Sequence, residues 1–327
     1  MIKKILLVVI VFLMFESCKV GTSGTFNNES IDKDIRTEIG QLNNKLFKAL
    51  RGNDVAAVKG MMSDQLLEKA GGDIEKIVTA ASASIGAKDY GILDEYYVKN
   101  TNTGIGNTVL SGISDDDYSV HYLALNKEMY VSLLLPNDKK NELLITAIYG
   151  KYDNQWKINI IYLGQYSIRN KTALDFYKMA KESDSKSYLV DAVNYTSLAK
   201  QLLKPAGDYF QYQKEKEIND FYEKEMKEVN SKFVFPLTLQ NISSKPKIFR
   251  IFPQVMSEGI LPCVFYITGT DIKDTVALKT ENEKVKVEVA KLFTGINKDK
   301  EAVLYRAFND LPDGKKTVQN YGFVDKK

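Results

Sequence analysis

Residues 142–164, ELLITAIYGKYDNQWKINIIYLG, contain two apolar segments separated by a short polar turn. The segment 142–152 is rich in β-branched and aromatic residues, which favour strands. In the segment 155–164 large apolar residues alternate with others, as in a half-buried strand: Trp156, Ile158, Ile160 and Tyr162. Because the intervening Asp153-Asn154 suits a tight turn, this stretch predicts an antiparallel β-hairpin.

Further strand-like segments precede the hairpin. From Lys88 onward the chain is rich in Tyr, Val, Ile and Leu and is interrupted by turn residues, a pattern typical of an antiparallel meander. Asp94 and Glu95 are neighbours in this region, so we expect their side chains on opposite faces of a strand. Besides the hairpin, the expected strands are residues 89–99, 107–113, 117–125 and 128–135.

The region before the strands has a helical pattern. Apolar residues recur there every three or four positions: Ile31, Ile35, Ile39, Leu42, Leu46 and Leu50. We expect Ser30 to cap the N-terminus of this helix and Gly52 to end it. Asn53 or Asp54 then begins a second helix, and a third follows. Helices followed by a meander predict an α+β domain over residues 31–165, with the helices packed on a curved antiparallel sheet.

This layout resembles a known superfamily. Three N-terminal helices, a curved meander and the closing sequence GKYDNQWKI at Gly150–Ile158 are similar to the nuclear transport factor 2-like superfamily. The resemblance covers residues 31–165 and implies a cone-like fold whose mouth binds a small molecule. No catalytic motif of that superfamily maps onto this chain. The candidate pocket residues are His121, Tyr97, Tyr149 and Trp156.

His121 is the only imidazole in the sequence. On a strand facing the cone it would act as a general base or ligand contact at neutral pH. This gives one alternative function, a hydrolase or isomerase acting on a small apolar molecule around His121. The lack of a surrounding motif favours instead a structural histidine that is bonded to a neighbouring strand or lies at the surface.

Residues 166–230 are expected to form a helical connector. Residues 172–182 and 188–203 have the pattern of an antiparallel helix pair, and a third helix follows over 209–230. The spacing of five residues is similar to that of a tetratricopeptide repeat: Phe176, Met179, Ala180, Ala192 and Ala199. A single unit cannot build a solenoid, which needs about three. A second alternative function is therefore a scaffold that docks a partner peptide on helices 172–203.

The last segment, residues 231–327, is expected to be a second, smaller α+β domain. A helix over 274–293 lies among strand-like segments. The expected strands are residues 233–239, 247–255, 260–268, 301–308 and 317–324.

The N-terminus has the pattern of an export signal. Lys3 and Lys4 precede 11 apolar residues, Ile5 to Phe15, whereas a membrane-spanning helix needs about 20. Ser17-Cys18 then resembles the lipobox of bacterial lipoproteins, although Glu16 departs from it. The resemblance implies a signal peptide over residues 1–17 and diacylation of Cys18, with palmitate among the acyl chains.

Residues 18–30 are small and polar, which predicts a flexible tether. Lipid on Cys18 would anchor the protein to a bacterial membrane of the cell envelope, and we expect the outer membrane. A chance cysteine after an ordinary signal peptide, or an uncleaved anchor, are the alternatives.

Composition excludes several classes of protein. The chain has 327 residues and a formal charge of +3, and five of its 45 basic residues are scattered arginines, which disfavours nucleic-acid binding. One His and two Cys rule out a Cys/His zinc cluster. The sequence has no nucleophile elbow, phosphate loop or metalloprotease motif. We therefore expect a non-catalytic binding module without metal or cofactor, whose partner is an envelope protein or a small apolar ligand.

Overall fold

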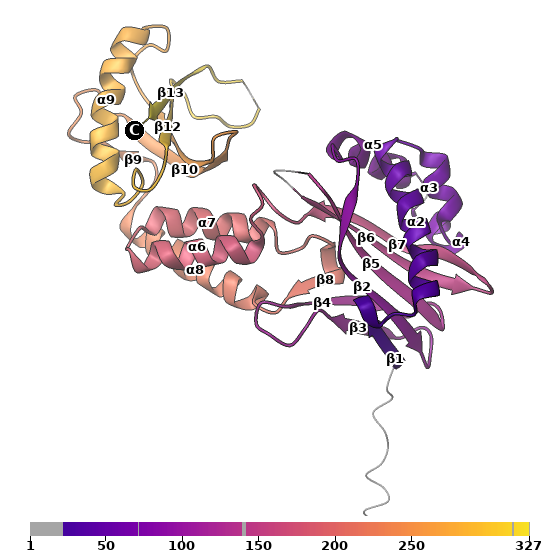
Figure 1. The fold of residues 1–327 in the computed structure, drawn as a ribbon. Helices are drawn as coiled ribbons and strands as arrows, with labels where there is room; N and C mark the ends of the chain where they lie inside the picture. The colour runs from indigo at the N-terminus through magenta and orange to yellow at the C-terminus, as the bar shows by residue number, and fades with distance from the viewer. Residues whose placement is uncertain (1–21, 71, 139–141, 316, 327) are drawn as a thin grey trace, which may run out of the picture. The chain divides into compact units, whose positions relative to one another are not determined.

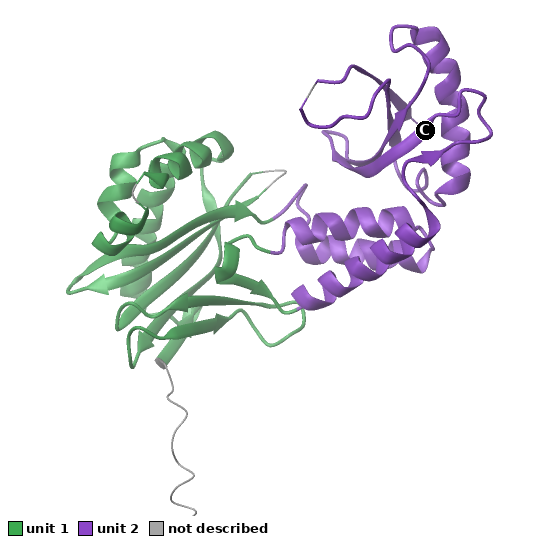
Figure 2. Cartoon of the chain, turned by 180° about the vertical axis from the view of Figure 1, so that it is seen from behind, with its two compact units in different colours: residues 1–166, 204–213 green, residues 167–203, 214–327 purple. Residues whose placement is uncertain are grey.

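The computed structural model describes residues 22–70, 72–138, 142–315 and 317–326. The signal peptide and Cys18 lie outside the described residues. The chain forms two compact units (Figure 2). Unit 1 comprises the chain up to Tyr166 together with Lys204–Gln213, and unit 2 comprises Ser167–Leu203 together with Lys214–Lys327.

Unit 1 contains a five-stranded antiparallel sheet in the order β1-β2-β5-β6-β7 and a three-stranded sheet in the order β3-β4-β8. Helices pack along the larger sheet (Figure 1). The helices are α2 (Lys33–Arg51), α3 (Val55–Met61), α4 (Asp64–Ala70) and α5 (Asp73–Ser84). The strands are β1 (Thr22–Asn27), β2 (Tyr90–Asn100), β3 (Gly106–Leu110), β4 (Tyr118–Leu123), β5 (Glu128–Pro136), β6 (Leu143–Tyr152), β7 (Gln155–Gln165) and β8 (Phe210–Tyr212), and a 3-10 turn, η1 (Asn28–Ser30), follows β1.

The α+β fold class and the central hairpin are confirmed. Strands β6 and β7 pair antiparallel, with Tyr152 opposite Gln155 across the turn. The apolar stripe of α2 packs against the larger sheet because its spacing places those residues on one helix face. The core of this interface includes Ile39, Leu46, Leu50, Tyr97, Tyr149, Trp156 and Ile158.

The helix ends follow the expected chemistry with one correction. The N-cap of α2 is Asp32 rather than Ser30, because the Asp32 carboxylate accepts hydrogen bonds from the backbone nitrogens of the first turn at 2.9 and 3.3 Å. Gly52 ends α2 as predicted. Asp54 caps α3 by accepting a 2.9 Å bond from the nitrogen of Ala57.

The segment expected to be a flexible tether differs from the prediction over its described part. Residues 22–27 form β1, an edge strand paired with β2. Phe26 stacks on Tyr97 with ring centroids 5.9 Å apart. The Asn28 side chain then forms two hydrogen bonds to β2. Its NH₂ group donates to the Asp94 carboxylate, and its oxygen accepts from the backbone nitrogen of Glu95. A partner strand about seventy positions away therefore orders a segment whose own composition favours flexibility.

The connector also differs from the prediction. Residues 210–212, expected to begin a helix, form β8, which pairs with β4 in unit 1. Phe210 is buried and stacks on Tyr118 at 4.3 Å between ring centroids. Just before it, the turn η2 (Gly207–Tyr209) starts with Gly207 at φ +58°, a backbone conformation that favours glycine.

Over its described residues, unit 2 combines four α-helices with a five-stranded sheet in the order β13-β12-β11-β10-β9. Its pairs are antiparallel except β11 with β12, because the helix α9 connects these two strands and a crossover permits a parallel pair. The helices are α6 (Ala173–Ser185), α7 (Leu189–Gln201), α8 (Glu215–Lys232) and α9 (Thr275–Leu292). The strands are β9 (Leu237–Thr238), β10 (Lys247–Val255), β11 (Ile260–Ile267), β12 (Ala302–Phe308) and β13 (Asn320–Lys326).

Within the described ranges, no helix has both the length and the apolar content that a bilayer crossing requires.

Candidate functional site

Three of the four predicted pocket residues lie together in unit 1. Tyr97, Tyr149 and Trp156 are buried between the larger sheet and α2. The Trp156 ring meets the Tyr97 ring edge-on, with centroids 6.3 Å apart. Their arrangement is that of a packed core.

The polar atoms of these three side chains have protein partners. The Tyr149 hydroxyl donates to Asn43 at 2.8 Å, and the Trp156 indole nitrogen donates to Glu38 at 3.2 Å. The Tyr97 hydroxyl donates to Glu128 at 2.5 Å. These bonds rigidify the interface with α2, and they use the donors that a ligand would need.

His121 lies in a different layer from the other three. It is on β4, where its Nδ1 lies 3.0 Å from the Thr108 hydroxyl and its Nε2 lies 2.8 Å from the Ser119 hydroxyl. Tyr118 on the same strand bonds Asp94 of β2. Because side chains alternate along a strand, His121 faces away from β2, and the structure does not bring it to Tyr97.

The contact of Ser119 with His121 resembles a nucleophile and its base, but two features differ from a catalytic pair. Ser119 is buried, with 6% of its surface exposed. The group on the other ring nitrogen is the Thr108 hydroxyl instead of a carboxylate, so it supplies no charge to stabilise an imidazolium. A hollow of about 360 Å³ lined by Leu123 lies on this face, and His121 is not part of its lining.

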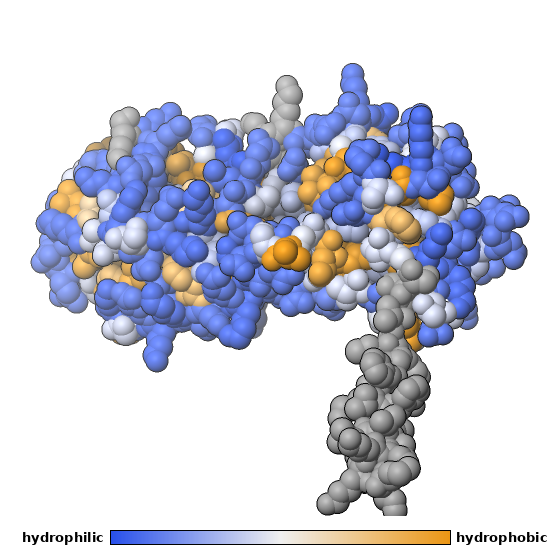
Figure 3. Space-filling model, turned by 60° about the horizontal axis from the view of Figure 1, so that its bottom comes forward, coloured by the Kyte–Doolittle hydropathy of each residue, from blue (hydrophilic) through white to orange (hydrophobic). Residues whose placement is uncertain are grey.

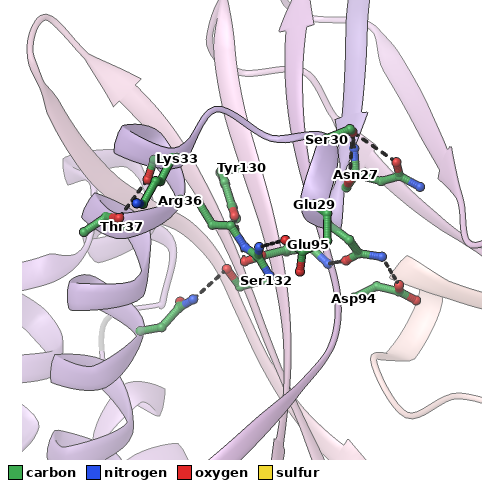
Figure 4. A network of polar contacts seen from close by, with 12 residues as sticks. Asn27, Glu29, Ser30, Lys33, Arg36, Thr37, Asp94, Glu95, Tyr130 and Ser132 are labelled. Atoms are coloured by element: carbon green, nitrogen blue, oxygen red, sulfur yellow. Dashed lines mark hydrogen bonds and ion pairs between the residues drawn. The ribbon is translucent and has the colours of Figure 1, made fainter.

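An ionic network around the buried Glu95 joins α2, β2 and η1 (Figure 4). Glu95, with 2% of its side chain exposed, accepts hydrogen bonds from the Arg36 Nε and, at 2.7 Å, from the Tyr130 hydroxyl. Arg36 also pairs with Glu29 at 2.6 Å. Hydrogen bonds to Glu29 and Glu95 raise the pKa of Arg36 further above its usual range. Burial, followed by the bond to Glu95, raises the pKa of Tyr130, which keeps this phenol a donor.

Asp94 lies on the other face of β2, as the sequence predicted. It accepts a 2.8 Å bond from Asn28 and a further bond from the Tyr118 hydroxyl. Asp94 and Glu95 therefore belong to separate networks on opposite faces of the strand, which excludes their acting as one acid–base pair.

Cys263 in unit 2 has the environment of an inert core thiol. It is buried, and desolvation raises its pKa to about 11, so the nucleophilic thiolate is scarce at neutral pH. Among the described residues, no cluster of His, Cys, Asp and Glu side chains has the arrangement of a metal site.

Unit 2 contains a cavity of about 220 Å³, here called the α7–β10 cavity. Its walls are mostly apolar, and three polar side chains interrupt them: Asn194, Asn230 and Arg250. The apolar lining residues are Val190, Val193, Met226, Val229, Phe235, Phe249, Ile251 and Phe293. Few polar groups in an otherwise apolar hollow are typical of a small-molecule site.

Two polar groups of this cavity lack partners. Asn194 is 6% exposed, and its side chain has no hydrogen-bond partner among the described residues. Arg250 has no hydrogen-bonded or ionic partner among them either, and its guanidinium lies 4.7 Å from the centre of the Phe252 ring. In the larger hollow of unit 1, by contrast, the buried Asn159 is bonded to Tyr152 and Asn126.

The sequence patterns did not identify this cavity. Its residues come from two helices, a strand and two connecting segments, so no local motif unites them. Arg250 is one of five arginines scattered along the sequence. The one sequence signal for this cavity is that Arg250 interrupts the mostly apolar segment 248–255.

The surface outside this cavity has other hollows, one of about 390 Å³ lined in part by Glu258, Glu301 and Lys326. The face drawn in Figure 3 is mostly hydrophilic, and its apolar side chains lie in small separate groups. Single exposed apolar residues such as Ile113, which is 99% exposed, are common on such surfaces. The α7–β10 cavity is therefore the strongest candidate functional site among the described residues.

Comparison of the whole chain with models of protein families and with the sequences of curated proteins gives no match.

Proposed function

We propose that this chain is an exported, lipid-anchored protein of a bacterial envelope that binds a small molecule without transforming it. The α7–β10 cavity carries the binding part of this proposal, because it combines apolar walls with a buried amide and a cation that lack partners. Both groups line the cavity and are used by no other side chain in the described parts of the chain, so a bound ligand can take their hydrogen bonds. Unit 2 is the ligand-binding part.

The anchoring part of the proposal rests on the N-terminal sequence. Lys3, Lys4, the apolar run and Ser17-Cys18 support cleavage before Cys18 and its acylation. Strand β1 begins at Thr22, four positions after Cys18. Since an extended chain spans at most about 3.6 Å per residue, the start of β1 would lie within roughly 14 Å of the lipidated residue. Unit 1 would then be held close to the membrane surface.

Unit 1 is proposed to belong to the nuclear transport factor 2-like superfamily. Helices packed on a five-stranded antiparallel sheet, and the closing hairpin with Trp156, support this assignment. In this chain the space between sheet and α2 is occupied by hydrogen-bonded aromatic residues. Its proposed role is that of a rigid base for the anchored protein.

The two alternative functions have weaker support. For a hydrolase or isomerase, His121 lies between two hydroxyl groups and faces away from the predicted pocket. For a peptide scaffold on helices 172–203, α8 already packs on this pair: the Tyr177 hydroxyl donates to Glu217 at 2.7 Å. Labelling of Ser119 by a serine-directed fluorophosphonate would favour the hydrolase, and we expect none.

The anchoring proposal is tested by the mass and the location of the native protein. We expect an N-terminus at Cys18 carrying acyl chains, and retention in the membrane fraction after an alkaline carbonate wash. The Cys18→Ser variant should keep its leader or leave the membrane fraction. A native protein with residues 1–17 attached and free in the cytoplasmic fraction would contradict the proposal.

A further inference from the structure

We infer that the α7–β10 cavity binds a small monocarboxylate with a compact apolar body. This inference rests on the proposed binding function and names the chemical class of its ligand. It depends on three features of the cavity: its cation, its buried amide and its volume.

The cation is Arg250. No Asp or Glu lines the cavity, and Arg250, an exposed residue, has no ionic partner among the described residues, so its guanidinium is available to a ligand at the edge of the cavity. The face of its guanidinium lies over the Phe252 ring. The N–H groups at the edge of the guanidinium can therefore donate to a ligand. A guanidinium edge matches a carboxylate with two parallel hydrogen bonds.

The backbone around Arg250 supports a built site. The pairing of β10 with β11 shifts register between Ile248 and Arg250, which leaves Phe249 as the extra residue of a β-bulge. A bulge redirects side chains and is frequent beside functional sites. Here Phe249, Arg250 and Ile251 all line the cavity, whereas three consecutive residues of a regular strand would alternate between its faces.

The amide is Asn194, on α7. It is more than nine-tenths buried, lines the cavity and lacks a protein partner in the described parts of the chain. Its NH₂ group can donate to a ligand oxygen. A carboxylate has acceptor capacity for both a guanidinium and an amide, while a ligand amine would be repelled by Arg250.

The volume limits the apolar body. A cavity of 220 Å³ has the volume of about seven liquid waters. A body the size of one aromatic ring with a short chain fits this space, whereas a long acyl chain would extend through the open side into solvent. The walls contribute Phe235, Phe249 and Phe293 for contact with such a ring.

The experiment is a calorimetric titration of the mature protein in lipid nanodiscs. The probes are 3-phenylpropanoate and its neutral isostere 3-phenylpropanamide, and empty nanodiscs correct for partition into lipid. We expect the acid to bind at least tenfold more tightly than the amide. Arg250→Met should reduce the affinity for the acid to that for the amide.

A matched control is available in the same unit. Arg306 also lies over an aromatic ring, that of Phe265, at 5.5 Å, but it does not line the cavity. Arg306→Met should therefore keep the preference for the acid. Val229→Phe, which fills the cavity, should abolish binding of both probes while the far-ultraviolet circular dichroism stays unchanged.

The outcomes separate this inference from the proposed function. Equal affinity for acid and amide, lost in Val229→Phe, would overturn the carboxylate and leave a binding cavity. An acid preference that survives Arg250→Met would overturn the role of Arg250 and with it the inference. No binding of either probe would overturn both the inference and the binding function.

Discussion

Arg36 compensates the charge of the buried Glu95 carboxylate in unit 1. The Glu95 carboxylate is 2% exposed, and Arg36 is its cationic partner, with 34% of its side chain exposed. A buried ion pair adds little net stability, but removing one partner leaves the other charge buried and uncompensated.

Substituting Arg36→Met should therefore destabilise unit 1 strongly. We expect a loss of about 3 kcal/mol in the free energy of unfolding, toward the lower part of the range for buried pairs because Arg36 is partly solvated. Glu29, which is 87% exposed, supplies the control: Glu29→Gln should cost under about 1 kcal/mol. Denaturant unfolding measures both, and equal losses would show that burial of Glu95 is not the cause.

Substituting Asn194 in unit 2 should have little effect on stability, in contrast to Arg36 in unit 1. Its amide has no protein partner among the described residues but is open to the cavity, so Asn194→Leu should change the stability of the ligand-free protein by less than about 0.5 kcal/mol. Asn282 is an equally buried asparagine that accepts a 3.2 Å bond from Tyr266, and Asn282→Leu should destabilise. Thermal unfolding distinguishes them, and a destabilised Asn194→Leu would mean that the amide has a structural role.

Lys300 and Asp191 form a second buried pair, which predicts a pH dependence. Their charged atoms lie 2.5 Å apart, and their side chains are 7% and 4% exposed. Burial raises the pKa of Asp191 above its ordinary 3.8, although the charge of Lys300 opposes the shift. Lys300→Met should cost about 3–5 kcal/mol near neutral pH, because the Asp191 carboxylate loses its counter-charge.

The sign of the pH effect follows from the raised pKa. Without Lys300, the pKa of Asp191 in the folded state should rise further above its value in the unfolded state. Stability of the variant then falls as pH rises through that interval, so the cost of the substitution should shrink as pH falls toward 4. Unfolding measured across this range tests it against Lys216→Met, which removes an exposed pair with Asp220 in the same unit. A cost independent of pH would contradict a buried, ionised Asp191.

At the scale of elements, the close approach of β7 to the segment before β8 holds residues 204–213 in unit 1. A Cβ added to Gly164 would lie 2.4 Å from the carbonyl oxygen of Pro205, whereas one added to Gly106 would meet nothing within 4 Å.

Gly164→Ala should therefore force this backbone apart and destabilise unit 1 by about 1–3 kcal/mol. Hydrogen exchange should accelerate in β8 before it does in β6. Gly106→Ala should change neither quantity by a comparable amount. Unchanged exchange in β8 of the Gly164 variant would show that this contact does not hold the strand.

Elements with their own periodicity were predictable from the sequence, and elements defined by distant partners were not. The stripe of α2 and the alternation of β7 are local patterns, and both elements are confirmed. Strand β8 has three residues and pairs with β4, whose sequence position is about ninety residues earlier. The α7–β10 cavity was missed for the same reason, since its two unpartnered groups lie on α7 and β10, more than fifty positions apart.

At the scale of the whole molecule, the order of elements predicted the α+β class, and the division of the chain was more complex than a linear series of domains. The chain leaves unit 1 at Tyr166, builds α6 and α7 of unit 2, and returns to unit 1 for Lys204–Gln213. Such a return depends on pairing of β8 with β4, which composition does not reveal. The parallel pair of β11 and β12 likewise depends on the crossover through α9.

The most direct measurement of ligand binding by unit 2 follows methionine methyl groups by NMR as 3-phenylpropanoate is added. Met226 lines the α7–β10 cavity, and Met129 is buried in unit 1. The proposed function predicts a saturable shift of the Met226 methyl resonance while that of Met129 stays in place. A Met226 resonance that does not move, or a saturable shift at Met129 in its stead, would contradict binding in this cavity.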